Sequence, residues 1–207
     1  MKALYAATAP LSAAVSAGIN TYNSTDRHGT TYADLSPNIT VRPSSFLRVS
    51  GGLRFSRNHD QSQWIEQDAR GQYVFGRIDQ HTVSLTARVN YTVTPTLSIQ
   101  LYAQPFVSAG DYSAFKELVN GRSKDYEGRY APILYASDPD FNYRSFRTTN
   151  VLRWEYKPGS TLFVVWQQGR EDTVNTGEFR FRRDVGGVFD APARNVFLVK
   201  WAYWLNY

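Results

Sequence analysis

Apolar and polar residues alternate strictly along several segments of the chain. Between residues 82 and 93 every second side chain is apolar, and those between them are polar; the apolar ones are Val83, Leu85, Ala87, Val89, Tyr91 and Val93. Side chains of a β-strand point alternately to its two faces, whereas a helix requires a 3.6-residue period. The pattern therefore predicts a strand with one apolar and one polar face.

Similar alternation and the turn residues between segments predict about nine strands. We place them at residues 2–8, 11–21, 32–41, 45–56, 80–93, 96–106, 144–156, 160–168 and 194–207. Phe115, Leu118 and Val119 have helical spacing, with Ser113 as a candidate N-cap and Gly121 as a stop, so a short helix is expected near residues 114–120. The predicted fold class is all-β, an antiparallel up-and-down meander.

Short and long connections alternate between these strands. Pro10, Pro43, Pro95 and Pro158 mark the short turns, and the other connections are long and polar. Transmembrane β-barrels of the bacterial outer membrane sort their connections in this way, with short periplasmic turns at one end and long extracellular loops at the other. The pattern thus favours part of a transmembrane β-barrel in the bacterial outer membrane over a soluble β-sandwich.

Composition removes several classes of protein. The chain is 42% hydrophobic and 20% charged and has no cysteine, which excludes a disordered chain, a disulfide framework and a thiolate metal site. A net charge of +5 without a clustered basic patch predicts no nucleic-acid partner. The longest apolar run, residues 162–166, is far shorter than the roughly 20 residues of a membrane-spanning helix.

The two ends of the chain have different targeting patterns. The first residues imitate a signal peptide, but the alternation over residues 11–20 favours a strand. At the other end, aromatic and apolar residues share one face, as in the last strand that the barrel-assembly machinery recognises: Trp201, Tyr203, Leu205 and Tyr207. An ordinary amphipathic strand is the alternative. We expect residues 1–207 to be a single barrel domain or the C-terminal fragment of a larger barrel.

Three segments show a resemblance to a known family. Residues 88–112, 152–167 and 197–203 resemble the C-terminal barrel region of domain-of-unknown-function family 5916, found in Gram-negative bacteria. Longer members have an N-terminal module similar to family 9 carbohydrate-binding domains, so the resemblance implies an outer-membrane barrel with a link to carbohydrate binding or uptake. Nothing in this chain matches that module, and no sugar-binding residue is predicted.

Charged and aromatic residues have expected positions in such a barrel. If the apolar faces meet lipid, the charged residues of the polar faces point into the lumen: Asp34, Arg48, Arg54, Arg88, Arg153, Glu155 and Lys200. Their basic excess predicts an anion-favouring lumen or, alternatively, ion pairs such as Arg153 with Glu155 that brace a narrow barrel. Aromatic residues are expected at the periplasmic membrane interface: Tyr91, Trp154, Tyr156, Tyr203 and Tyr207.

Candidate chemistry is sparse. His28, His59 and His81 lie in or beside predicted loops without metal-ligand spacing. His59 and Asp60 suggest half of a catalytic dyad or two solvated loop residues, and residues 138–140 suggest a calcium ligand pair or a plain turn. No catalytic, cofactor-binding or metal-binding residue is predicted, and no cofactor is expected.

The sequence therefore predicts an outer-membrane β-barrel segment that acts as a channel or as the anchor of a missing N-terminal domain. Its expected partners are the lipid bilayer and the barrel-assembly machinery. The alternatives are a hydrolase at the barrel rim and the barrel end of a TonB-dependent receptor. Because single-chain barrels have even strand numbers, nine strands predict either that strands are missing or that the first strand is not real and the other eight close into a barrel. We favour missing strands, and therefore expect an open sheet whose first and last strands are not paired with each other.

Overall fold

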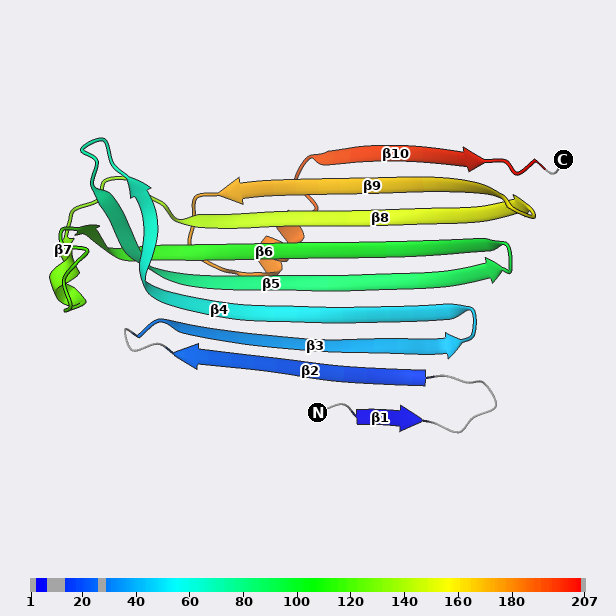
Figure 1. Ribbon diagram of the computed structural model, residues 1–207, viewed down its shortest axis with the longest axis horizontal. Coiled ribbons are helices and arrows are strands. Elements are labelled where there is room, and N and C mark those ends of the chain that lie inside the picture. Colours follow the sequence, from blue (N-terminus) through cyan, green and yellow to red (C-terminus); the bar gives the residue numbers. More distant parts are fainter. Residues whose placement is uncertain (1–2, 7–13, 26–28, 206–207) are drawn as a thin grey trace.

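The computed structural model describes residues 3–6, 14–25 and 29–205, which form one antiparallel sheet with two short helices (Figure 1). Nine strands follow one another across the sheet in chain order: β1 (Ala3–Ala6), β2 (Ala14–Thr25), β3 (Thr31–Ser44), β4 (Leu47–Gln67), β5 (Tyr73–Thr94), β6 (Leu97–Leu118), β8 (Phe141–Lys157), β9 (Ser160–Val174) and β10 (Ala193–Ala202). A short tenth strand, β7 (Tyr130–Pro132), pairs with the outer part of β6. The predicted all-β antiparallel meander is confirmed.

The sheet is open. Its pairing runs from β1 to β10, and within the described residues these two strands are not paired with each other. They lie at opposite edges in Figure 1. The expectation of an open sheet is therefore confirmed.

The short turns lie together at one end of the sheet, the right-hand end in Figure 1, which we call the turn end. They join β3 to β4, β5 to β6 and β8 to β9. In the last of these turns Gly159 has a φ of +76°, a conformation that glycine adopts without the steric cost of a Cβ. The connections after β4, β6 and β9 lie at the opposite end, the loop end, as the sorting of connections in the sequence predicts.

Three strands are much longer than predicted. Strands β4, β5 and β6 have 21, 22 and 22 residues. The sheet therefore continues into many of the residues that the sequence predicts as loops, between residues 57 and 80 and beyond residue 108. The helix expected near residues 114–120 is wrong, because β6 continues to Leu118. There Glu117 pairs with Val74 of β5 on one side and with Ala131 of β7 on the other, which satisfies the backbone as strand.

The helices lie elsewhere in the connections. A 3₁₀ turn, η1 (Glu127–Arg129), precedes β7, and α1 (Phe181–Gly187) lies between β9 and β10. Among the described residues, no helix is long and apolar enough to cross a membrane.

Strand register collects the alternating apolar residues on one side of the sheet. Directly paired residues of neighbouring strands point to the same face. Leu53 pairs with Leu85, and the other apolar pairs include Val89 with Leu101, Leu152 with Val164 and Val164 with Val199. We call this side the apolar face and the opposite side the polar face. The buried apolar core is small and lies near the loop end: Val74, Ile78, Val83, Val107, Ala109, Val188 and Ala191.

Candidate functional site

The apolar face is exposed over a belt next to the turn end. Leu85 is 45% exposed, Trp154 45% and Trp201 68%, although all three are large apolar side chains. The belt ends toward the loop end, where Val83 of the same strand is only 6% exposed. Soluble monomers rarely expose a continuous apolar patch of this kind. The stretch of β5 from Leu85 to Val93 is about as long as the 9–11 residues of a tilted transmembrane strand.

Aromatic side chains border this belt at the turn end. The rings of Trp154 and Tyr156 lie 6.0 Å apart, and Nε1 of Trp201 donates a hydrogen bond of 2.6 Å to the Tyr156 hydroxyl. Tyr91 packs edge-on against Phe46 at the β3–β4 turn. Rings with a polar tip suit an interface between lipid and water, and the location of these residues at such an interface stays a prediction.

The C-terminal strand is shorter than predicted. β10 ends at Ala202, so Trp201 lies in the strand whereas Tyr203 and Leu205 follow it, and all three are exposed. The Tyr203 ring lies beneath the Lys157 ammonium at 5.4 Å. Tyr207, predicted both as an interface aromatic and as part of the assembly signal, lies outside the described residues.

The register places all seven charged residues predicted to face the lumen on the polar face. Arg54 pairs across the strands with Ser84, and Arg153 with Ser98. The remaining five follow the same alternation: Asp34, Arg48, Arg88, Glu155 and Lys200.

Some of these charges are paired. Nε of Arg54 lies 2.6 Å from Oδ2 of Asp34, and a guanidinium nitrogen of Arg153 lies 3.3 Å from a carboxylate oxygen of Glu155. The Arg88 guanidinium lies over the Tyr102 ring at 5.3 Å. Within the part of the chain that the structure describes, Arg88, Arg48 and Lys200 have no ion-pair partner. The polar face therefore has one ion pair that links β3 to β4, a second pair within β8, and basic groups that are available to solutes.

The polar face is hollowed between β2 and β6. The hollow has a volume of about 510 Å³ and is lined mainly by hydroxyl, amide and guanidinium groups, among them those of Ser36, Asn38, Arg54, Ser84 and Gln104. A surface of this composition is suited to water and polar solutes rather than to lipid.

Residues 175–192, which include α1 and which we call the α1 connection, fold back over the apolar face at the loop end. Phe189 packs against Phe146 of β8 with ring centroids 5.2 Å apart, and Phe179 stacks on His81 of β5 at 6.0 Å. Val188 is fully buried in this contact. The connection therefore ends the exposed belt on its loop side.

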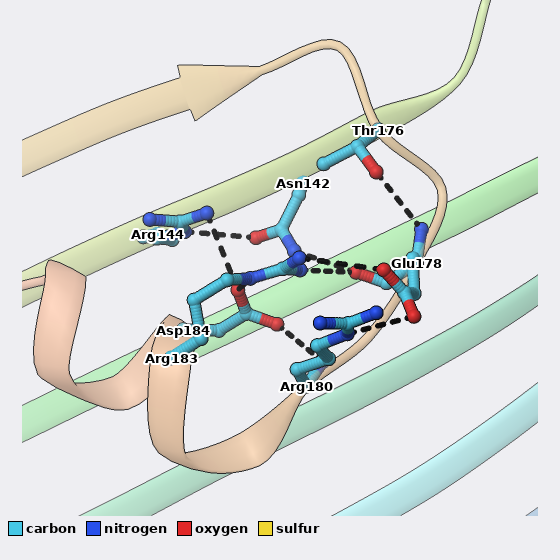
Figure 2. A network of polar contacts seen from close by, with 7 residues as sticks. All are labelled: Asn142, Arg144, Thr176, Glu178, Arg180, Arg183 and Asp184. Carbon is cyan, nitrogen blue, oxygen red and sulfur yellow. Dashed lines mark hydrogen bonds and ion pairs between the residues drawn. The ribbon is translucent and has the colours of Figure 1, made fainter.

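A network of polar contacts fixes the α1 connection to the sheet (Figure 2). The carboxylate of Asp184 is fully buried and lies 2.7 Å from Nε of Arg183 and 3.2 Å from a guanidinium nitrogen of Arg144 on β8. Its second oxygen accepts a hydrogen bond of 2.6 Å from the Arg180 amide. Asn142 of β8, also fully buried, donates to the Glu178 carbonyl at 3.2 Å.

The charge of Asp184 is stabilised by these donors. Burial alone would raise the pKa of Asp184, but the hydrogen bonds from Arg183, the Arg180 amide and Asn142, with the positive charge of Arg183, together lower the pKa below its usual value. The sequence alone does not reveal this network, because its two halves, near residues 142 and 184, are distant in the chain and follow no periodic pattern.

The candidate dyad of His59 and Asp60 is not formed. Nδ1 of His59 lies 2.8 Å from a carboxylate oxygen of Asp79, and its Nε2 lies 2.8 Å from the amide nitrogen of Gln61, not from a hydroxyl nucleophile. Asp60 instead accepts a hydrogen bond from the Ser62 amide. The arrangement resembles an Asp–His pair but lacks the third group that nucleophilic catalysis requires.

The acidic turn at residues 138–140 has a structural role. Asp140 accepts a hydrogen bond of 2.7 Å from the Tyr112 amide, which fastens the start of β8 to β6. Burial raises the pKa of Asp140 above its usual value. In the described ranges, no group of three or more acidic, histidine or cysteine side chains could hold a metal ion.

Comparison with families of known proteins gives a match. A family model described as "Domain of unknown function (DUF5916)" matches residues 7–207. No curated protein matches the chain, and no solved structure matches it.

Proposed function

The chain belongs to the DUF5916 family, and from this premise we propose that it forms part of the wall of a bacterial outer-membrane β-barrel. The observation that best supports the proposal is the exposed apolar belt, which lies on one face of a sheet whose other face is polar. Its length along β5 fits a bilayer, and aromatic residues border it at the turn end. Unpaired backbone groups are costly in lipid, so in the membrane both edges of the open sheet pair with further strands.

We propose further that the wall encloses a water-filled lumen. The hollow on the polar face and the basic groups of Arg48, Arg88 and Lys200 support a channel that favours anions. The ion pair between Arg54 and Asp34 would link two strands of that wall. An anchor for a further domain requires the same belt but no lumen. Anion conductance of the complete barrel that contains this chain, measured in planar bilayers, therefore separates the two functions.

A soluble β-sandwich is less well supported. In such a fold a second sheet packs over the apolar face of the first. Among the described residues the α1 connection covers that face only at the loop end, and Leu85, Trp154 and Trp201 stay exposed.

The proposal is tested by placing one charge on either side of β5. Leu85→Arg puts a guanidinium on the apolar face and should impair insertion into outer membranes, at a cost of about 2–4 kcal/mol near the midplane. Thr86→Arg is the matched control, because residue 86 lies on the polar face. Insertion is measured as the fraction of protein that resists urea extraction. Equal insertion of the two variants, or recovery of the unmodified chain in a detergent-free soluble fraction, would exclude the membrane wall.

A further inference from the structure

A β-bulge interrupts β6 at its loop end. Arg77 pairs with Ser113 and Phe75 with Lys116, so β6 has one more residue than β5 between these two pairs. Ala114, inside the bulge, has a φ of +49°, a left-handed conformation that is unfavourable for any residue with a Cβ. Bulges redirect the side chains beside them, and strained backbone of this kind is concentrated at binding sites.

The bulge lines a pocket of about 580 Å³. One wall contains Phe115 and Lys116 of β6. The rest of the lining comes from η1 and β7. Strand β7 is held in place by its pairing with β6, in which Pro132 pairs with Lys116 and Tyr130 with Leu118. Three of its eight lining residues are aromatic, and the lining contains one basic residue, Lys116, and one acidic residue, Glu127.

The ammonium group of Lys116 is poised for an anionic partner. Its Nζ donates one hydrogen bond of 2.6 Å, to the Gln61 carbonyl, and lies 4.5 Å and 5.3 Å from the ring centroids of Tyr130 and Tyr126. An ammonium has three N–H donors. Burial lowers the pKa of Lys116 below its ordinary value, and the negative charge of Asp60 offsets this only in part. No carboxylate among the described residues lies within ion-pair distance of its Nζ. A bound anion would supply the missing charge-assisted hydrogen bonds.

We propose that this pocket binds a small organic carboxylate with a flat apolar body. The carboxylate accepts hydrogen bonds from Lys116, and the body packs against the side chains of Tyr130 and Pro132, which share the face of Lys116. Glu127 is exposed and lines the same pocket, so its negative charge disfavours phosphate and other dianions more than a single carboxylate. This inference is independent of membrane insertion, because all of these residues lie beyond the exposed belt.

The proposal is tested by isothermal titration of the full chain in detergent with benzoate, cyclohexanecarboxylate, benzyl alcohol and inorganic phosphate. We expect saturable binding of at least one carboxylate, weaker binding of the neutral alcohol and no binding of phosphate. Lys116→Met should lower carboxylate affinity about tenfold or more, since it removes a charge-assisted hydrogen bond. Lys124→Met removes the same charge from the neighbouring connection, outside the pocket lining, and should leave affinity unchanged.

A second variant tests the sign of the charge. Glu127→Gln is a conservative change at an exposed residue and should strengthen carboxylate binding. Each of four results would overturn the proposal. They are weaker binding by Glu127→Gln, equal binding by Lys116→Met and the unmodified chain, phosphate binding as strong as that of carboxylates, and no saturable binding of either carboxylate. Thermal unfolding of each variant verifies that it is folded.

Discussion

Two residues at the loop end, Ala114 and Asp184, occupy positions that are unfavourable when each is considered alone. Ala114 adopts a left-handed backbone conformation, and Asp184 is a fully buried carboxylate. The sheet stabilises the first by pairing on both sides of the bulge, and three donors from Arg183, Arg144 and the Arg180 amide stabilise the second. Neither position could be predicted from alternation, because each depends on contacts between distant segments.

The strain at Ala114 can be measured directly. Ala114→Gly removes the Cβ that makes a φ of +49° unfavourable, which stabilises the folded chain. Glycine also raises the conformational entropy of the unfolded chain, which offsets part of this gain. We expect a net rise in the free energy of unfolding of roughly 0.5–1 kcal/mol. Ala87→Gly is the control, since it lies in regular β5 and should lower stability by about the same amount. Urea unfolding in detergent gives both values. A loss of stability in Ala114→Gly equal to that in Ala87→Gly would contradict the strain.

At the scale of elements, the structure shows where periodic patterns are informative. Strands near the turn end were predicted to within a few residues, because one face is apolar and the other polar. The outer halves of β4 and β5 were assigned to a loop, since residues 57–67 are mostly polar and show no alternation. Their strand structure comes from mutual pairing, such as that of Asn58 with Gln80, which the sequence of either segment alone does not reveal.

The α1 connection is the element whose placement depends most on charge. Because Asp184 has a lowered pKa in the folded chain, its contribution to stability is present above the unfolded pKa of about 4 and is lost as pH falls through the folded value. We therefore expect the connection to detach from the sheet below about pH 4. Amide hydrogen exchange of residues 175–192, measured as a function of pH, should show faster exchange there while exchange in β5 and β6 stays unchanged.

A substitution separates this effect from general acid unfolding. Asp184→Asn leaves Arg144, whose side chain is only 11% exposed, without its anionic partner and should destabilise the connection by about 3–5 kcal/mol. The same substitution should abolish the pH dependence of exchange in this range. Asp190→Asn is the control, because Asp190 is exposed and outside the network. If both variants keep the pH dependence of the unmodified chain, Asp184 is not the responsible group.

For the whole molecule, the two ends of the sheet differ more than its two edges. The turn end has short connections, and the loop end has the extended β4–β5 hairpin and the α1 connection (Figure 1). Aromatic side chains border the belt at the turn end, and the pocket at Lys116 lies at the loop end. The sequence predicted this asymmetry from the positions of its prolines. It could not predict the pocket, whose walls meet only because β7 pairs with β6.

The asymmetry predicts one orientation in the outer membrane, with the turn end periplasmic and the loop end extracellular. The chain has no cysteine, so single-cysteine variants report position without background. Lys124→Cys lies in the exposed connection after β6 and should react with a membrane-impermeant maleimide on intact cells. Pro158→Cys, at the β8–β9 turn, should react only after the outer membrane is opened; it is preferred to Gly159, whose left-handed φ disfavours a side chain. Because the belt separates the two positions, labelling of both from outside would contradict the transmembrane wall, and labelling of Pro158→Cys alone would reverse its orientation.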